Sequence, residues 1–136
     1  MREIKFRGMI EGTKTWIKAK NIHYYYDEQG TLKCFMNPKG GFLDDIGDGF
    51  IKFQPSVVDI ETIGQFTGLH DKNGAEIFEG DVVRIGSKNY LIEWNKFTAG
   101  FVVKYYARIS DLHMDMYEVI GNIHEGEQPC TSAIVE

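Results

Sequence analysis

The sequence predicts a mainly β protein made of short antiparallel strands, with at most one or two short helices. Three observations lead to this prediction. Runs of β-branched and aromatic residues recur along the chain, separated by turn-forming Gly, Asn, Asp or Ser. Several of these runs alternate apolar with polar residues. In the second part of the chain the runs are short and numerous, which favours a small barrel or a compact sandwich.

The composition is that of a globular chain. Of the 136 residues, 43% are hydrophobic and 26% are charged, and a disordered chain would have fewer apolar residues. A chain of this length buries roughly two thirds of its unfolded surface. It therefore has the size of one domain, or of two small β units that share a core.

The expected strands can be placed along the chain. In the first part they are residues 3–10, 15–27 and 32–36. In the second part they are residues 62–69, 76–78, 81–85, 89–94, 100–107 and 117–123. Residues 42–53 fit neither the helical nor the strand period, and residues 109–117 predict either one helical turn begun by Ser110 or Asp111, or an irregular loop.

Pro55 marks a seam between an aromatic first part and a second part of short apolar runs. The expected units are an N-terminal β unit at 1–55, a β-barrel unit at 56–128 and a tail at 129–136. One compact domain overall is the alternative.

The Gly- and Asp-rich stretch between residues 64 and 85 is interpreted as scaffold. Asp71 can accept bonds from backbone N–H groups of a hairpin turn that ends at Gly74, and Gly80 with Asp81 repeats this arrangement. A calcium loop is excluded by spacing, because position 12 counted from Asp71 is Val82 instead of Glu.

No pattern of catalytic or cofactor-binding residues is present in the sequence. It contains no nucleophile elbow, phosphate-binding glycine loop or closely spaced pair of metal-binding histidines, and His113 with Asp115 is too common a pair to indicate a metal site. Cys34 lies in an apolar run and is expected to be a buried small hydrophobe, and Cys34 and Cys130 are expected to be reduced thiols. We therefore expect no catalytic residues, no metal and no cofactor.

The charge is unevenly distributed. Residues 1–20 carry a net charge of +4, so the other 116 residues carry −9 of the total of −5. The acidic bulk disfavours non-specific nucleic-acid binding, although a basic face on the first strands stays open as a site. No apolar run approaches the roughly 18 residues that cross a bilayer, and the charged N-terminus is unlike a signal peptide, so a cytoplasmic protein without a membrane partner is expected.

One candidate binding face combines basic and aromatic side chains. If residues 16–26 form one continuous strand, the period of two places five side chains on the same face: Trp16, Lys18, Lys20, Tyr24 and Tyr26. Such a face could stack bases and neutralise phosphates of single-stranded nucleic acid. The other interpretation is that the aromatic rings belong to the core and the lysines lie at its edge.

Three segments resemble the signature blocks of the YopX family, small proteins of bacteriophages and prophages of low-GC bacteria. They read REIKFRG, TIGQFTGLHDKNGAEIFEGDVV and YEVIGNIHE. The resemblance implies a mostly β protein whose second part is a small SH3-like barrel, and it implies no known activity. It assigns a structural turn role to Gly68, Asp71, Gly74, Gly80 and Asp81, and a closing strand to Gly121 and Asn122.

Three functional hypotheses follow. The first is a non-enzymatic module that binds an unknown host or phage protein in the host cytoplasm through a strand edge or an aromatic face. The alternative is a nucleic-acid-binding accessory protein that uses the basic and aromatic first strands. An enzyme whose catalytic residues come from distant positions is the third. Self-association through strand edges is compatible with each of them.

Overall fold

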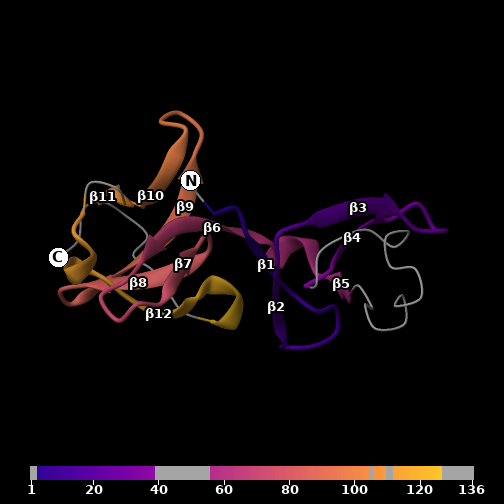
Figure 1. Ribbon diagram of the computed structural model, residues 1–136, viewed down its shortest axis with the longest axis horizontal. Coiled ribbons are helices and arrows are strands. Elements are labelled where there is room, and N and C mark those ends of the chain that lie inside the picture. Colours follow the sequence, from indigo (N-terminus) through magenta and orange to yellow (C-terminus); the bar gives the residue numbers. More distant parts are fainter. Residues whose placement is uncertain (1–2, 39–55, 105, 110–111, 127–136) are drawn as a thin grey trace. The chain divides into compact units, whose positions relative to one another are not determined.

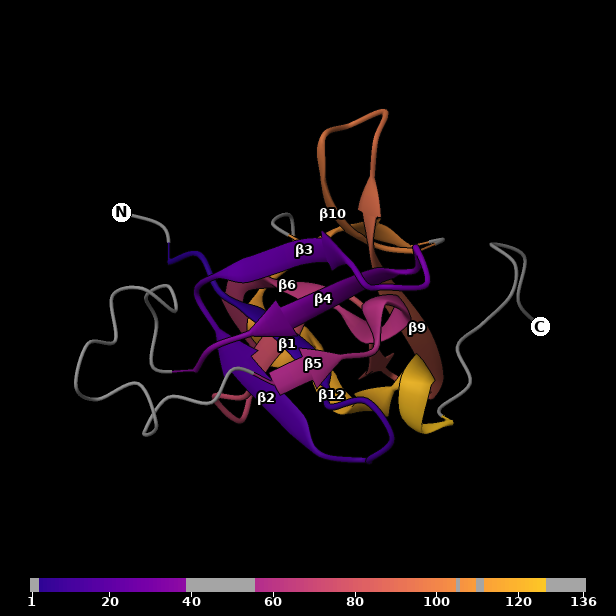
Figure 2. The ribbon, with the colours of Figure 1, turned by 90° about the vertical axis from the view of Figure 1, so that its right-hand side faces the viewer.

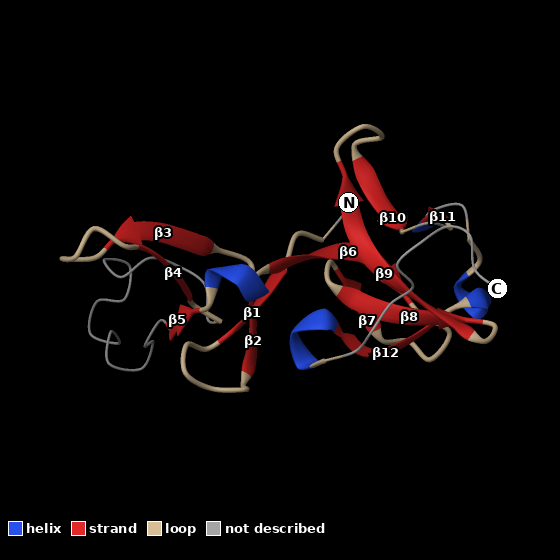
Figure 3. Ribbon diagram, turned by 180° about the vertical axis from the view of Figure 1, so that it is seen from behind, coloured by secondary structure: helices blue, strands red, loops and turns tan. Residues whose placement is uncertain are grey.

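The computed structural model describes residues 3–38, 56–104, 106–109 and 112–126. The chain divides into two compact units, Met1–Gln65 (unit 1) and Phe66–Glu136 (unit 2). The described elements are antiparallel strands with short 3₁₀ helices, as Figure 3 shows. The predicted fold class, mainly β with short antiparallel strands, is confirmed. In the described part of the chain, no helix has the length and apolar character needed to cross a membrane.

Unit 1 begins with a two-stranded ribbon. β1 (Phe6–Met9) pairs with β2 (Trp16–Ala19), so that Arg7 lies opposite Lys18. On its other side β1 pairs with the first residues of β6 (Gly64–His70), with Phe6 opposite Gln65. β6 then continues into unit 2. The ribbon is therefore held on both sides of β1.

A second sheet of unit 1 has the order β3-β4-β5. Its strands are β3 (Ile22–Tyr26), β4 (Leu32–Met36) and β5 (Ser56–Val58), and Figure 2 shows β4 between the other two. The prediction of one continuous strand from Trp16 to Tyr26 is wrong. The chain leaves β2 after Ala19 because β2 pairs with β1, whereas β3 pairs with β4.

The described core of unit 1 lies between these strands. Its fully buried members are Ala19, Cys34, Met36 and Val58, and isoleucines together with Phe6 pack around them. Gly8 allows β1 to approach this core closely, because an added Cβ would lie 3.1 Å from Met36 Sδ and 3.2 Å from Val58 Cβ. The glycine thus sets the spacing between the ribbon and the second sheet.

Residues 56–65 belong to unit 1, so the division falls later in the chain than Pro55. β5 pairs with β4, and the short 3₁₀ helix η3 (Ile60–Thr62) follows it. The Thr62 hydroxyl accepts a 2.9 Å hydrogen bond from the backbone N–H of Met9, which holds this helix against β1. The predicted boundary at Pro55, the segment 42–53 and the predicted tail lie outside the described residues.

Unit 2 contains a five-stranded antiparallel sheet of order β11-β10-β9-β8-β12. The strands are β8 (Asp81–Ile85), β9 (Lys88–Asn95), β10 (Gly100–Val103), β11 (Ala107–Arg108) and β12 (Glu118–Asn122). β7 (Glu76–Phe78) pairs with the second half of β6. Figure 1 shows β8 beside β12 within this sheet. The described pairings form an open sheet, and the SH3-like barrel stays a prediction.

A cluster of apolar side chains forms the core of unit 2. It consists of Ile77, Val83, Tyr90, Ile92, Phe101, Val103, Ile109 and Tyr117. The strand predicted at 100–107 is interrupted, because the backbone N–H of Tyr106 bonds to the carbonyl of Val103 in a turn. A helical turn is present at Met114–Met116, capped by His113, whose ring accepts the backbone N–H of Asp115. The predicted starting residues, Ser110 and Asp111, lie outside the described residues.

The Asp71 carboxylate joins two distant parts of unit 2. One oxygen accepts the backbone N–H groups of Asn73 (2.8 Å) and Ala75 (2.9 Å), which closes the turn between β6 and β7. The other oxygen accepts the N–H of Val119 in β12 at 2.8 Å. Asp71 is 1% exposed. Gly74 completes the turn with φ of 84°, a left-handed conformation that glycine adopts at little cost.

Contacts of the neighbouring residues reinforce this link. Lys72 donates its backbone N–H to the carbonyl of Tyr117, and the Asn73 side chain donates to the carboxylate of Glu118. Burial raises the pKa of Asp71, but the three backbone N–H groups and the charge of Lys72 outweigh it and hold that pKa below its usual value. Burial and the negative charge of Asp71 raise the pKa of the Tyr117 phenol.

The other motif residues lie at the start of β8, at the end of β12 and at register shifts in β6 and β12. Asp81 accepts the backbone N–H of Phe78 at 2.8 Å, and Gly80 between them has φ of 94°. Asn122 caps the short helix η6 (Ile123–Glu125) by accepting the N–H of His124. Gly68 and Gly121 lie where the register of β6 and of β12 shifts, which is the usual position of a β-bulge.

Replacement of Asp71 by Asn should destabilise unit 2. The amide would present an N–H₂ group to the N–H of Val119 or to the turn, so at least one buried donor loses its acceptor, and we expect a loss of about 2 kcal/mol. Urea denaturation followed by tryptophan fluorescence measures this change. Asp115→Asn is the control because Asp115 is exposed, and it should change the free energy of unfolding by less than about 0.5 kcal/mol. Equal effects of the two substitutions would contradict the assignment.

The acid dependence of stability should also come in part from Asp71. Because its folded pKa is lowered, the ionised carboxylate stabilises the fold above the unfolded value of about 3.9, and this contribution is lost as pH falls through the folded pKa. The free energy of unfolding should therefore fall more steeply below about pH 4 in the wild type than in Asp71→Asn. Parallel acid limbs for the two proteins would exclude this explanation.

Candidate functional site

The structure separates the five residues of the predicted binding face. Trp16 and Lys18 lie on β2, Lys20 follows its end, and Tyr24 and Tyr26 lie on β3. The alternation of a single strand cannot join them, since β2 and β3 belong to different sheets. The structure thus divides the predicted face into a basic group on the ribbon and an aromatic group on β3.

The aromatic group lies on a hairpin, which we call the tyrosine hairpin (residues 22–36). It consists of β3, the turn after Tyr26, and β4. Figures 1 and 3 show that its turn extends beyond the described strands of unit 1. Among the described strands, β3 is an edge strand, because β4 is its partner in the sheet. Within the described residues, no strand pairs with the other side of its backbone.

One face of the tyrosine hairpin carries an exposed apolar patch. Tyr26 lies opposite Leu32 and Tyr24 lies opposite Cys34, so Tyr24, Tyr26 and Leu32 share a face. Their exposed fractions are 53%, 72% and 41%. Cys34 and Met36 on the same face of β4 are buried in the core. The face of the hairpin that is buried at Cys34 and Met36 is therefore exposed to solvent at the patch, nearer the turn.

The opposite face of the hairpin is also aromatic. His23 stacks on Phe35 with ring centroids 4.9 Å apart, and Tyr25 lies against the same ring at 5.9 Å. The Phe35 ring of β4 therefore packs against two side chains of the edge strand β3, His23 and Tyr25. These contacts fix β3 on β4 and leave Tyr25 37% exposed.

Local bonds hold the hairpin in one conformation. The Asp27 carboxylate accepts the backbone N–H groups of Gln29 and Thr31, and Gly30 has φ of 79°. Lys33 on β4 forms a 2.8 Å ion pair with Glu11 of the turn between β1 and β2. A surface held in this way loses little conformational entropy when a partner binds.

Unit 2 has an apolar hollow of about 650 Å³. It is lined by Gly68, Leu69, His70, Gly74, Ile109, Leu112, His113 and Tyr117. Its two histidines have structural contacts, since His70 packs edge-on against Phe66 and His113 caps the helical turn and lies 3.3 Å from Asp115. Within the described residues, no three His, Cys, Asp or Glu side chains are grouped so that they could hold a metal ion.

Cys34, the one nucleophile candidate named from the sequence, is fully buried. Burial raises the pKa of its thiol, and a bond from the backbone of His23 offsets this in part. A buried thiol with a raised pKa is a poor nucleophile, because the thiolate is the reactive form.

We expect Cys34 to react with a thiol reagent only when unit 1 opens. In a Cys130→Ser variant, 5,5′-dithiobis(2-nitrobenzoate) should label Cys34 slowly under native conditions and rapidly in denaturant, because the thiol is inaccessible in the fold. Absorbance of the released thiolate follows the reaction. Labelling as fast as that of a free thiol at neutral pH would show that the site is open.

The sequence pattern indicated the tyrosines and lysines of the predicted face but did not indicate two residues that the structure places beside them. Leu32 joins the exposed patch only through the pairing of β4 with β3, and Arg7 joins the basic group only through the pairing of β1 with β2. The turn signals at Asp27 and Gly30 could have indicated the first pairing, because they fix the register of a short hairpin.

The chain resembles known proteins in structure and in sequence. No curated protein matches the chain. Among solved structures, the crystal structure of protein EF1440 from Enterococcus faecalis is similar, with 24% sequence identity and a TM-score of 0.52, over 92% of this chain and 96% of that chain. This similarity concerns the fold.

The sequence profile described as YopX protein matches residues 5–128. This range includes the second and third blocks noted in the sequence, residues 5–8 of the first block, and every described strand of both units. The chain belongs to the YopX family.

Proposed function

We propose that this YopX protein is a non-enzymatic protein-interaction module, and that the tyrosine hairpin is its binding surface. The observation that carries the proposal is the patch formed by Tyr24, Tyr26 and Leu32 on an edge strand of unit 1. The partner is an extended segment of another protein that adds to the open side of β3. Such strand addition combines backbone hydrogen bonds with contacts to alternate side chains.

The chemistry of the patch supports a protein partner. Tyrosine offers a large, rigid apolar area with a polar end, and it is enriched at protein interfaces and among the residues that dominate binding energy. Asp27 and Glu28 make the adjacent turn acidic, so a partner segment with Lys or Arg next to its apolar residues would be complementary.

The setting that we propose is the cytoplasm of a bacterial host, with a phage or prophage as the source of the protein and a host or phage protein as its target. The basis is the resemblance of the three sequence blocks to YopX proteins of phages and prophages. The second hypothesis, nucleic-acid binding, depends on the basic group of the ribbon.

The proposal predicts that the two exposed tyrosines are required for partner retention. Tagged protein is purified from prophage-induced host cells after nuclease treatment, and retained proteins are identified by mass spectrometry. Tyr24→Ser/Tyr26→Ser should retain the specific partner at least about tenfold less than the wild type, because exposed tyrosines of this kind act as anchors. The matched control is Phe97→Ser/Tyr106→Ser, which removes two exposed aromatic rings from unit 2.

Three results would overturn the proposal. They are retention of no specific protein, equal loss in both double variants, and loss of the partner on nuclease treatment alone. Peptides that tile the identified partner then test the mode of binding. A single extended peptide should compete with the whole partner for wild-type protein and should not bind the Tyr24→Ser/Tyr26→Ser variant.

A further inference from the structure

The ribbon of unit 1 places basic side chains of two strands on one face. Arg7 and Lys18 are directly opposite each other, whereas Phe6 and Ala19 of the next pair face the core. Because side chains alternate along a strand, Lys20 and Lys5, the next residues on the Arg7–Lys18 face, lie one position beyond the paired segment. The guanidinium of Arg7 lies 4.7 Å from the ring centroid of Trp16 on the same face.

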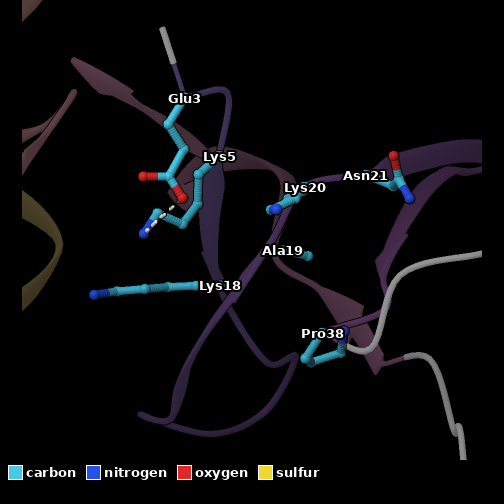
Figure 4. Close-up of a pocket in the computed structure, with 7 residues that line it drawn as sticks. All are labelled: Glu3, Lys5, Lys18, Ala19, Lys20, Asn21 and Pro38. Carbon is cyan, nitrogen blue, oxygen red and sulfur yellow. Dashed lines mark ion pairs between the residues drawn. The ribbon is translucent and has the colours of Figure 1, made fainter. Parts of the chain in front are cut away.

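A hollow lies beside the lysines of the ribbon. A cavity of about 550 Å³ is lined by Glu3, Lys5, Lys18, Ala19, Lys20, Asn21 and Pro38. Figure 4 shows the side chains of Lys5 and Lys18 extending to the same side of the ribbon, with Lys20 seen nearly end-on beside them, whereas Ala19 points to the other side. The carboxylate of Glu3 lies 3.6 Å from the ammonium group of Lys5. Three lysines and one carboxylate therefore surround a single hollow.

The N-terminal part of the chain, which includes the ribbon, is basic. Residues 1–20 carry a net charge of +4 in a chain whose total is −5, so the basic residues are concentrated here. The positive charge around the hollow would attract an anion.

We propose that the hollow is a phosphate-binding site formed by Lys5, Lys18 and Lys20, with Glu3 as a competitor that an arriving phosphate displaces from Lys5. The ammonium groups act as point charges with several donors each, a form suited to phosphate oxygens. The cavity has the volume of a site for a compact ligand. The phosphate belongs to a nucleotide-sized molecule or to the backbone of a single-stranded nucleic acid.

The proposed site and the exposed patch of the tyrosine hairpin consist of different residues. Glu3, Lys5, Lys18 and Lys20 lie on or beside β1 and β2, and the exposed patch lies on β3 and β4. Loss of one activity without loss of the other is therefore expected for each set of variants.

The test measures phosphate binding directly. The probes are pyrophosphate and ATP without added metal, followed by isothermal titration calorimetry, and a fluorescein-labelled single-stranded 12-mer, followed by anisotropy at low and at moderate salt. Lys18→Gln/Lys20→Gln should weaken binding about tenfold or more, since two charge contacts are removed. Lys88→Gln/Lys96→Gln removes the same charge from unit 2 and should leave binding within about twofold of the wild type.

Two further variants make the result specific to the hollow. Lys18→Arg/Lys20→Arg keeps both charges and should restore most of the binding, which separates loss of charge from loss of fold. Glu3→Gln should bind more tightly than the wild type, since the carboxylate no longer occupies Lys5. Far-ultraviolet circular dichroism confirms that each variant retains the strands.

The outcomes divide clearly. Binding of ATP and pyrophosphate that depends on Lys18 and Lys20 supports a free phosphorylated ligand, and lysine-dependent binding of the 12-mer with none of the small probes assigns the site to nucleic-acid phosphates. Absence of binding to every probe at low salt would overturn the proposal. So would equal loss in the two Gln double variants, or weaker binding in Glu3→Gln.

Discussion

Three backbone N–H groups converge on the buried carboxylate of Asp71, and the arrangement of unit 2 depends on this convergence. Two of the bonds are local and shape the turn that follows β6. The third reaches β12, which lies 48 residues later in the sequence. A charged acceptor in a buried position is costly unless its bonds are complete. The carboxylate therefore stabilises the contact between the turn after β6 and β12. Any arrangement in which one of the three backbone N–H groups lacks this acceptor would be less stable.

Unit 1 is organised by close approach of strands to its core. Among the described residues, Gly8 lets β1 pack directly on Met36 and Val58 of that core. Part of the apolar surface of the unit lies outside the described core, on the tyrosine hairpin. The bonds of Asp27 and the ion pair of Lys33 hold that surface in place.

What could be predicted from the sequence depended on how local the responsible interactions are. The mainly β class, the strands at 32–36, 76–78 and 81–85, and the turn residues Asp71 and Gly74 follow from short-range patterns, and the structure has those strands at the same bounds. The bond from Val119 to Asp71 could not be predicted, because no local pattern encodes a partner so distant in the chain. The break after Ala19 was missed for a related reason, since the residues of both strands have the same strand-like composition.

β6 belongs to both units, and this determines how freely the chain can make pairing errors. Gly64 and Gln65 are paired with β1, whereas Phe66 is paired with Phe78 of β7. A shift of β6 by one residue would turn its side chains to the wrong face in one unit and in the other at the same time. The register of this strand is therefore constrained by two pairings, one with β1 and one with β7. A register error that one pairing tolerates would be destabilised by the other.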